Sequence, residues 1–242
     1  MLPTVASNAA VTPAFIGSYL QYVRDNSGEL ISLTLQHFDI VALAIAIAVP
    51  VGVTLGVLIT FNDRAATVVI WLAGIMMTVP SIALFGLLIP ILGIGNPPVI
   101  VALVLYSQLP IIRNTYVGLQ QVDPAAVEAG EGLGMSRIER LRRVQLPIAL
   151  PVIMAGVRNA VVILIGIAAI GAFIGAGGLG NPIFSGISQA QTARIVVATI
   201  LLSGLALSVD YMLGIVEQLL RLRNGEDIDQ SVGTRACRRV IS

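Results

Sequence analysis

Long apolar stretches separated by short polar breaks dominate the pattern of this chain. Residues 40–60 form an apolar run without a charged side chain, and residues 65–112 contain no charged residue at all. A membrane-spanning helix needs about 20 apolar residues, so the second stretch is too long for one span. The turn signal Gly-Ile-Gly-Asn-Pro-Pro at residues 93–98 divides it. The pattern predicts spans at 40–60, 67–91 and 99–112. The last is short, and its continuation toward Leu119 is left open.

The second half of the chain alternates in the same way. A polar segment rich in Arg and Glu, residues 113–147, precedes apolar runs at 148–174 and 195–220. A glycine-rich turn segment begins at residue 175 between these two runs, and the chain becomes polar from Arg221 onward. We therefore predict an all-α integral membrane protein with about five transmembrane helices. Its parts are an external amino-terminal segment (1–38), a transmembrane domain (39–222) with a loop at 113–147, and a tail (223–242).

The amino-terminal segment contains a possible surface helix. Over residues 14–38, Phe15, Ile16, Tyr19, Leu20 and Val23 fall on one helical face. This pattern is typical of an amphipathic helix on the outer leaflet, and equally of an ordinary lead-in helix. The Ser-Gly pair at residues 27–28 is expected to break the helix before the first span begins.

Composition supports the membrane assignment and excludes several kinds of chemistry. Hydrophobic residues make up 56% of the 242 residues and charged residues only 11%, whereas a soluble domain carries about 25% charged residues. The net charge of +1 gives no argument for nucleic acid as a partner. All basic residues are Arg, so the chain lacks the Lys of a phosphate-binding loop. With one Cys and one His it has neither an internal disulfide nor a multi-His or Cys-based metal site. We expect no catalytic residue, metal or cofactor in this chain.

The distribution of Arg predicts the orientation. Placing the loop at 113–147 in the cytoplasm also puts residues 61–66 and the carboxyl tail there, with 11 of the 14 Arg residues. Short cytoplasmic loops are enriched in Lys and Arg, so we expect a multi-pass protein of the cell membrane with its amino terminus outside and its carboxyl terminus in the cytoplasm.

The cytoplasmic loop has its own helix signals. Asp123 and Pro124 are a typical helix cap and first position, and glycines at 132 and 134 are expected to end that helix. Ser136 and Glu139 have the spacing of a capping box for a second helix, which we expect to run to Leu146. Pro147 is expected to mark the return to the membrane. A capped helix–turn–helix held between two spans is suited to docking a partner, and the alternative is a merely solvated loop.

These residues resemble the EAA loop of binding-protein-dependent ABC importers. The family pattern is Glu-Ala-Ala, then Gly six residues after the Glu, and Ile-x-Leu-Pro beginning sixteen residues after it. This chain has Glu128, Ala129 and Gly134 in register, followed by Leu146 and Pro147. It departs with Gly130 for the second Ala and with Val144 for Ile. The resemblance extends over residues 35 to 222.

Other segments resemble the osmoprotectant branch of this family, which imports glycine betaine, carnitine, choline or proline betaine. They are Thr-Val-Pro-Ser at 78–81, Arg-Asn-Thr at 113–115, Gly-Leu at 118–119 and Gly-Ala-Gly-Gly-Leu-Gly at 175–180. Methionine importers share the fold and much of the pattern and remain an alternative.

The resemblance implies a permease that acts with separate partners. These are a pair of ABC ATPase subunits that bind ATP and Mg²⁺, a second permease that is identical or a paralogue, and an extracytoplasmic substrate-binding protein. Glu128 and Gly134 are then the expected centre of the ATPase-coupling surface, although Glu128 also suits the first turn of a helix for its charge alone. The remaining candidates in the loop are Val127, Ala129, Gly130, Leu133, Met135, Ile138, Leu146 and Pro147.

Candidates for the translocation path or its gates lie in the spans. Arg158 is a charge near membrane depth, where charges are costly and often functional, and Asp210 in the last span is a possible structural partner. The other candidates are Pro80, Ser81, Tyr106, Gly177 and Gly178. From other classes of protein, an ion-coupled secondary transporter or a membrane scaffold are the alternatives. An ion-coupled transporter commonly carries ionisable residues within its spans, and the first three spans of this chain have none.

Overall fold

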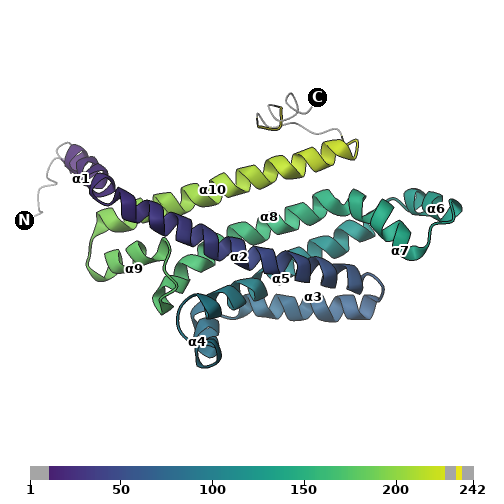
Figure 1. Cartoon of the computed structure of the whole chain (residues 1–242), viewed down its shortest axis with the longest axis horizontal. Helices are drawn as coiled ribbons and strands as arrows, with labels where there is room; N and C mark the ends of the chain where they lie inside the picture. Colours follow the sequence, from purple (N-terminus) through teal and green to yellow (C-terminus); the bar gives the residue numbers. More distant parts are fainter. Residues whose placement is uncertain (1–10, 227–232, 236–242) are drawn as a thin grey trace, which may run out of the picture.

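The computed structural model describes residues 11–226 and 233–235, with side chains from residue 17 onward, and every regular element in those ranges is helical (Figure 1). The helices are α1 (Val11–Asp25), α2 (Ser27–Ile59), α3 (Asp63–Thr78), α4 (Ser81–Leu92), α5 (Asn96–Gln120), α6 (Pro124–Gly132), α7 (Arg137–Arg140), α8 (Leu146–Ile170), α9 (Gly180–Ser188) and α10 (Thr192–Arg223). A π-helical stretch, Leu141–Gln145, joins α7 to α8, and a 3₁₀ turn, Gly171–Ile174, follows α8. The predicted all-α fold class is confirmed.

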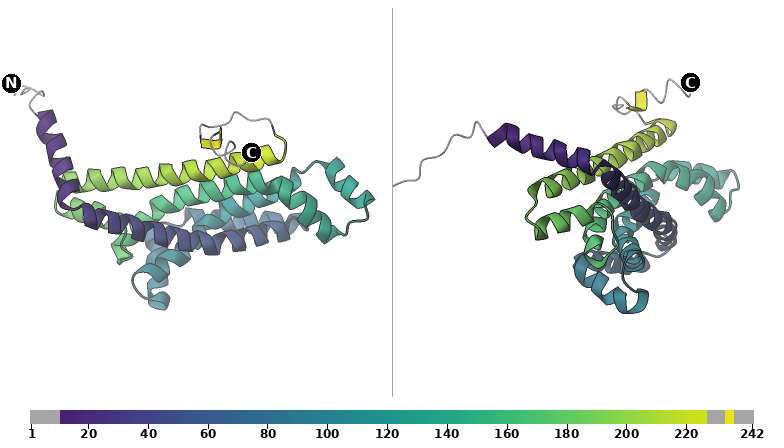
Figure 2. Two further views of the ribbon diagram at one scale, coloured as in Figure 1. Left: turned by 45° about the horizontal axis from the view of Figure 1, so that its top comes forward. Right: turned by 60° about the vertical axis from the view of Figure 1, so that its left-hand side comes forward.

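Three long helices, α2, α5 and α8, form the centre of the bundle (Figure 1, Figure 2). Their closest contacts are at glycines. A Cβ atom on Gly56 would lie 2.5 Å from the Cβ of Thr115, and one on Gly156 would lie 2.5 Å from the Cβ of Asn114. Small residues of this kind let helix backbones approach closely in a membrane, where packing rather than the hydrophobic effect drives helix association.

The number of spans is four or five, depending on how one bent pair of helices is counted. Over the described residues, α2, α5, the stretch Arg137–Ile174 and α10 are each long and apolar enough to cross a membrane. Helices α3 and α4 meet that criterion only together, and they are bent by 98° at their junction. The span predicted at 67–91 is thus a pair of helices with a sharp bend rather than one straight helix. The residue before a proline is pushed out of the helical region, so Val79 is extended, with φ −69° and ψ 128°, and α3 ends before Pro80.

Two predicted boundaries fall within continuous helices. Helix α1 ends at Asp25, close to the expected break, but α2 begins at Ser27 and runs without interruption to Ile59. Residues 27–38 are thus the first turns of α2 rather than part of a separate lead-in segment. The side chains of Phe15 and Ile16, on the predicted amphipathic face, lie outside the described residues.

The second helix of the loop does not end at Leu146, as was predicted, because Arg137–Ile174 is one helical stretch of 38 residues. A proline inside a helix crowds the turn before it. Here the preceding turn, Leu141–Gln145, is π-helical and therefore wider. The helix consequently continues through Pro147 into α8.

Different helices and turns lie at the two ends of the bundle. At one end lie α6, α7, the turn between α2 and α3, and the carboxyl end of α10 (Figure 1). At the other lie α1, α9 and the turn between α4 and α5. The segment expected to be a turn at 175–191 contains a helix, α9, that the glycine-rich sequence did not indicate.

Candidate functional site

Helix α6 begins and ends as its sequence predicts. The side chain of Asp123 accepts a hydrogen bond from the backbone N–H of Ala125 at 2.8 Å. At the other end Gly134 has φ +79°, and its N–H donates to the carbonyl of Glu131 while that of Met135 donates to the carbonyl of Gly130. This pair of bonds is the Schellman motif, which favours glycine at the left-handed position. Gly134 is therefore required by the backbone of the turn itself.

Gly130, the departure from the family pattern, lies under a neighbouring side chain. It is buried, and a Cβ atom there would lie 3.3 Å from Cγ of Arg140 and 3.5 Å from Sδ of Met135. The guanidinium of Arg140 forms an ion pair with Glu131 at 2.9 Å. This contact fixes α6 against α7, and Gly130 provides the room for it.

The second helix of the loop is capped by half of the predicted capping box. The Oγ atom of Ser136 accepts from the backbone N–H of Glu139 at 3.3 Å. The carboxylate of Glu139 instead forms an ion pair with Arg143, one turn later, at 3.1 Å. The loop is thus held in one shape by contacts within itself.

The four apolar residues predicted as docking contacts do not share one environment. Leu133 and Ile138 are 77% and 64% exposed. Both are apolar, and both lie on the polar loop rather than on one of the long apolar spans. Val127 and Met135 are half-buried, and Val127 packs within the loop toward the start of α8. Exposed apolar side chains on a polar loop indicate a surface that another protein covers. Leu133 and Ile138 fit that role, whereas Val127 stabilises the loop.

Glu128 and Ala129 lie on the exposed side of α6. Glu128 forms no ion pair with any residue that the structure describes, so its charge is available to a partner. Leu146 is half-buried in the cluster that supports the loop, and Pro147 is exposed.

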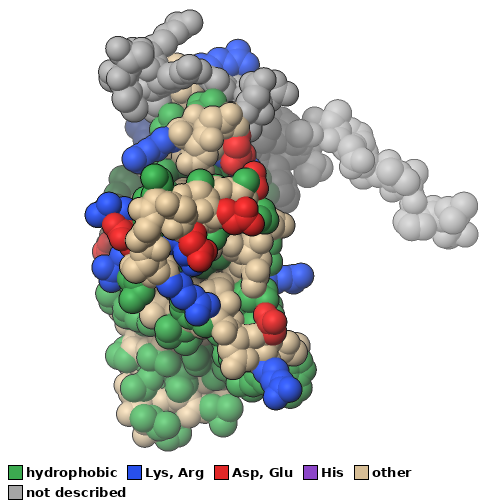
Figure 3. Space-filling view, turned by 90° about the vertical axis from the view of Figure 1, so that its right-hand side faces the viewer, with side chains coloured by type: hydrophobic (Ala, Val, Ile, Leu, Met, Phe, Trp, Pro, Cys, Tyr) green, Lys and Arg blue, Asp and Glu red, His purple; other side chains and the backbone are tan. Residues whose placement is uncertain are grey.

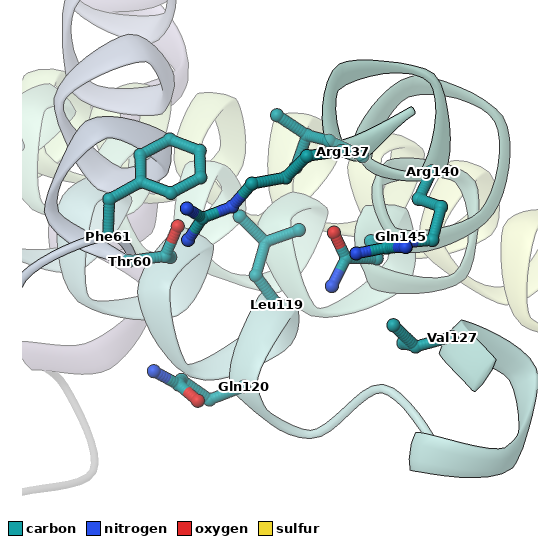
Figure 4. Close-up of a pocket in the computed structure, with 9 residues that line it drawn as sticks. Thr60, Phe61, Leu119, Gln120, Val127, Arg137, Arg140 and Gln145 are labelled. Carbon is teal, nitrogen blue, oxygen red and sulfur yellow. The ribbon is translucent and has the colours of Figure 1, made fainter. Parts of the chain in front are cut away.

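The loop also contacts the turn between α2 and α3. The guanidinium carbon of Arg137 lies 4.5 Å from the centre of the Phe61 ring (Figure 4), a distance at which a cation is attracted to an aromatic face. A pocket opens beside this contact, lined by Thr60, Phe61, Leu119, Gln120, Val127, Arg137, Arg140, Leu141 and Gln145. Seen end-on, charged side chains gather over this part of the molecule (Figure 3).

Farther along the bundle, an ion-pair network joins α8 to α10. Arg158 donates from Nε and Nη2 to the two carboxylate oxygens of Asp210 at 2.6 and 2.7 Å. Its Nη1 atom donates to Glu217 at 3.3 Å, and Glu217 in turn accepts from Arg221 at 3.1 Å. Gly214 lies beneath the guanidinium, where a Cβ atom would be 3.2 Å from Cζ. The predicted pairing of Arg158 with Asp210 is confirmed, and Glu217 extends it.

The same two helices are joined again near the coupling loop. Pro151 has no N–H to donate to the carbonyl four residues earlier, that of Pro147. The side-chain amide of Asn224, just beyond α10, donates to that carbonyl at 3.3 Å and to the carbonyl of Ile148 at 3.1 Å. Asn224 thus provides a partner for an oxygen that the proline leaves free.

The other pathway candidates lie at helix breaks. Tyr106 is buried in the core, and its hydroxyl donates to the carbonyl of Val79 at 2.7 Å. It therefore stabilises the sharp bend at Pro80, after which Ser81 begins α4. Its role in the structure is to hold this corner.

The two glycine turns at the other end of the bundle lie in contact with each other. The N–H of Gly95 donates to the carbonyl of Ile174 at 3.0 Å. Gly177 and Gly178 are buried in the segment that follows, with φ +81° and +70°. The two turns are therefore neighbours at this end of the bundle.

Comparison with known families identifies the chain. Residues 48–222 match the family described as binding-protein-dependent transport system inner membrane component. The chain belongs to this family. It is therefore a multi-pass inner-membrane component of an ABC transport system and has no catalytic role of its own. Membership implies a binding protein and an ATPase as partners.

The names of several similar proteins state a transported solute or a class of solutes. The chain is 47% identical over 199 residues to the osmoprotectant import permease protein OsmW of Salmonella typhimurium, covering 80% of this chain and 93% of the relative. It is 42% identical to the choline transport system permease protein OpuBB of Bacillus subtilis, covering 83% and 93%. A glycine betaine/carnitine/choline permease protein of the same organism, OpuCB, is 41% identical, covering 82% and 92%.

The fold is also that of solved transporters. An inward-facing structure of the MetNI methionine ABC transporter matches with a TM-score of 0.70 at 22% identity, covering 79% of this chain and 95% of that one. An amino acid ABC transporter with histidines matches with a TM-score of 0.65, covering 85% and 98%. At such identity these structures establish the fold alone.

Sequence reasoning missed three contributors to these sites: Glu217, Gly214 and Asn224. A helical spacing signal was present for the first two, because residues 210, 214 and 217 fall on one face of α10. Asn224 carried no such signal, since its partner carbonyl is 77 residues away in the chain.

Proposed function

We propose that this chain is the permease of an ATP-driven importer of osmoprotectants such as glycine betaine, carnitine, choline and proline betaine. The observation that carries the proposal is identity of 41–47% over about four fifths of the chain to three permeases, one named for osmoprotectants, one for choline and one for glycine betaine, carnitine and choline. Two permease subunits, identical or paralogous, would enclose the path. A separate extracytoplasmic binding protein would deliver the solute, and a pair of ATPase subunits would bind ATP and Mg²⁺.

The proposed orientation places the end with α6 and α7 in the cytoplasm and the end with α1 and α9 outside. The support is the distribution of Arg residues, which favours the cytoplasmic side for loops that carry them. In this orientation the amino terminus is external and the carboxyl terminus is cytoplasmic.

The coupling surface would consist of α6 and the turn at Gly134. Leu133 and Ile138 provide exposed apolar contacts, and Glu128 provides a charge with no ion-pair partner among the described residues. The ion pair between Arg140 and Glu131 joins α6 to α7. A displacement of α6 by the ATPase would therefore displace α7 as well.

The motion would then travel along a single helix. The stretch Arg137–Ile174 contains 38 residues, which corresponds to about 57 Å at 1.5 Å per residue. It begins in the coupling loop, carries Arg158 in its middle and ends at the glycine segment of the opposite face. Because Asp210 and Asn224 fasten α10 to it, we expect the two helices to move together as ATP binding shifts the equilibrium between two states.

Uptake by cells decides between the substrates. A strain that lacks other osmoprotectant importers, supplied with this chain and the proteins encoded beside it, should accumulate radiolabelled glycine betaine, carnitine or choline at high salt. The control strain carries the same partner proteins and lacks this chain. Uptake of methionine with none of the quaternary ammonium solutes would contradict the proposal and support the methionine alternative.

An ion-coupled secondary transporter is the alternative from another class. The membership of the binding-protein-dependent family argues against it. Uptake should accordingly stop when the ATPase subunit is inactivated by substitution of its catalytic residue, and it should persist for a short time when the proton gradient alone is dissipated.

A further inference from the structure

We propose that Gln36 and His37 form a latch that holds the outer glycine segment, residues 175–180, closed against α2. The segment follows the helical stretch Arg137–Ile174, whereas the two latch residues lie on α2. The latch therefore joins the stretch that is proposed to move with the coupling loop to a neighbouring helix. The inference rests on the proposed function, because it assigns these residues a part in the transport cycle.

Gln36 binds the backbone of the segment. Its Oε1 atom accepts a hydrogen bond from the N–H of Gly178 at 3.0 Å. A Cβ atom on Gly177 would lie 2.5 Å from Nε2 of Gln36. Only a glycine, with its positive φ and lack of a side chain, lets the backbone come this close.

His37 binds α8 beside the same segment. Its ring is completely buried, and Nε2 lies 3.0 Å from the carbonyl oxygen of Ile165. A carbonyl accepts only, so Nε2 carries the proton and Nδ1 presents a lone pair. Among the described residues that Nδ1 atom, which is buried, has no hydrogen-bond partner, and a Cβ atom on Gly178 would lie 2.9 Å from it.

Some contacts of the latch favour the closed arrangement, and one opposes it. The two hydrogen bonds, from Gly178 to Gln36 and from His37 to Ile165, favour the closed arrangement. The unsatisfied Nδ1 atom opposes it, because a buried acceptor without a partner costs free energy that water would restore on opening. A contact of this kind is suited to a gate that must release during each cycle.

A third element joins the same place. The turn between α4 and α5 donates a hydrogen bond from Gly95 to Ile174, at the start of the glycine segment. Ala176 and Leu179, within the segment, are almost completely buried. Three parts of the chain thus meet and close this end of the bundle.

Cysteine labelling measures opening of the latch directly. The only cysteine of the sequence, Cys237, is replaced by serine, and Ala176→Cys places a thiol inside the closed segment. In membranes from cells that express the full chain with its transport system, N-ethylmaleimide should label this thiol slowly. Gln36→Met removes the acceptor at similar size, and it should raise the labelling rate roughly threefold to tenfold, as expected for one lost hydrogen bond.

Two further variants separate a latch from a general loss of structure. Gln36→Glu keeps an acceptor and should label as slowly as the parent, whereas His37→Leu should label faster if it accumulates. Gln189→Met makes the same kind of change at an exposed residue of the outer face and should leave the rate unchanged.

An unchanged labelling rate in Gln36→Met, with normal amounts of protein in the membrane, would overturn the proposal. Equal acceleration in Gln36→Glu or Gln189→Met would do the same. Labelling does not depend on the identity of the substrate, so a latch without glycine betaine uptake would overturn the proposed substrate and leave the latch standing.

Discussion

Arg158 and Asp210 face each other across α8 and α10 with two parallel hydrogen bonds of 2.6 and 2.7 Å. This bidentate geometry is the strongest arrangement of an arginine and a carboxylate. Glu217 contributes a second acceptor to the same guanidinium. The arrangement fits a structural clamp between two helices, because the charged groups are occupied by each other.

We expect the removal of one partner to be worse than the removal of both. Asp210→Leu leaves Arg158 with a single carboxylate and should lower the stability of the folded protein by about 1–3 kcal/mol, less than for a fully buried pair since both side chains are about one third exposed. The double variant Arg158→Leu with Asp210→Leu should recover part of that loss. Thermal unfolding of the purified protein measures both effects. A double variant that is as unstable as the sum of the two single variants would contradict a pairwise clamp.

Gly214 should tolerate little increase in size. An alanine there places its Cβ 3.2 Å from the guanidinium carbon of Arg158, so Gly214→Ala should be mild and Gly214→Leu should displace the guanidinium. Gly204, on the same helix, has no atom within 4 Å of the Cβ position and supplies the control Gly204→Leu. Protein amount and uptake should fall for the first leucine and not for the second. Equal effects would show that helix propensity, rather than the clamp, is responsible.

The features that the sequence predicted correctly depend on local chemistry. The cap at Asp123 and the glycine at 134 follow from backbone geometry within a few residues, and both are present. The pairing of Arg158 with Asp210 was predictable despite the distance, because few charges in the spans could satisfy each other at that depth.

The features that the sequence did not predict depend on packing between distant segments. Hydropathy gave the length of the run at 67–91 but not the direction of the bend at Pro80, which Tyr106 stabilises from another helix. The bond from Gly178 to Gln36 joins residues 142 positions apart, and no local pattern marks it. Helix α9 begins in a glycine-rich segment that reads as a turn, and its packing against α10 supports it instead.

The proposed topology predicts the position of two reporters. A reporter fused after Val240 should be cytoplasmic, and one inserted next to Asn96 should be external, since the Arg-rich loops then face inward. Paired alkaline phosphatase and fluorescent protein fusions measure this directly. Both reporters on the same side would contradict the crossing of the membrane by α5, α8 and α10. Since α3 and α4 are sharply bent, a third reporter in the turn between α2 and α3 tests whether that pair crosses the membrane as one span. If this reporter lies on the same side as the one at Asn96, the bent pair enters and leaves on one face.

Gly134 and Glu128 should affect coupling without affecting folding. No described atom lies within 4 Å of a Cβ on Gly134, so the first carbon of a larger side chain there meets open space. Its cost is the left-handed backbone, about 1 kcal/mol, together with its projection into the space that a docked ATPase would occupy. Asn accepts the left-handed conformation better than other residues. Gly134→Asn should therefore retain part of the uptake, and Gly134→Trp should lose it.

Glu128→Ala should show a smaller, graded loss. Exposed ion pairs contribute about 0–1 kcal/mol, so the variant should retain a measurable fraction of uptake and of ATPase co-purification. Each variant is expressed with the transport system, and its membrane level, co-purified ATPase and glycine betaine uptake are measured together. Normal membrane levels with lost ATPase binding place the defect at docking. Full uptake by Gly134→Trp would remove this turn from the coupling surface, because a bulky side chain at a docked interface cannot be accommodated without displacing the partner.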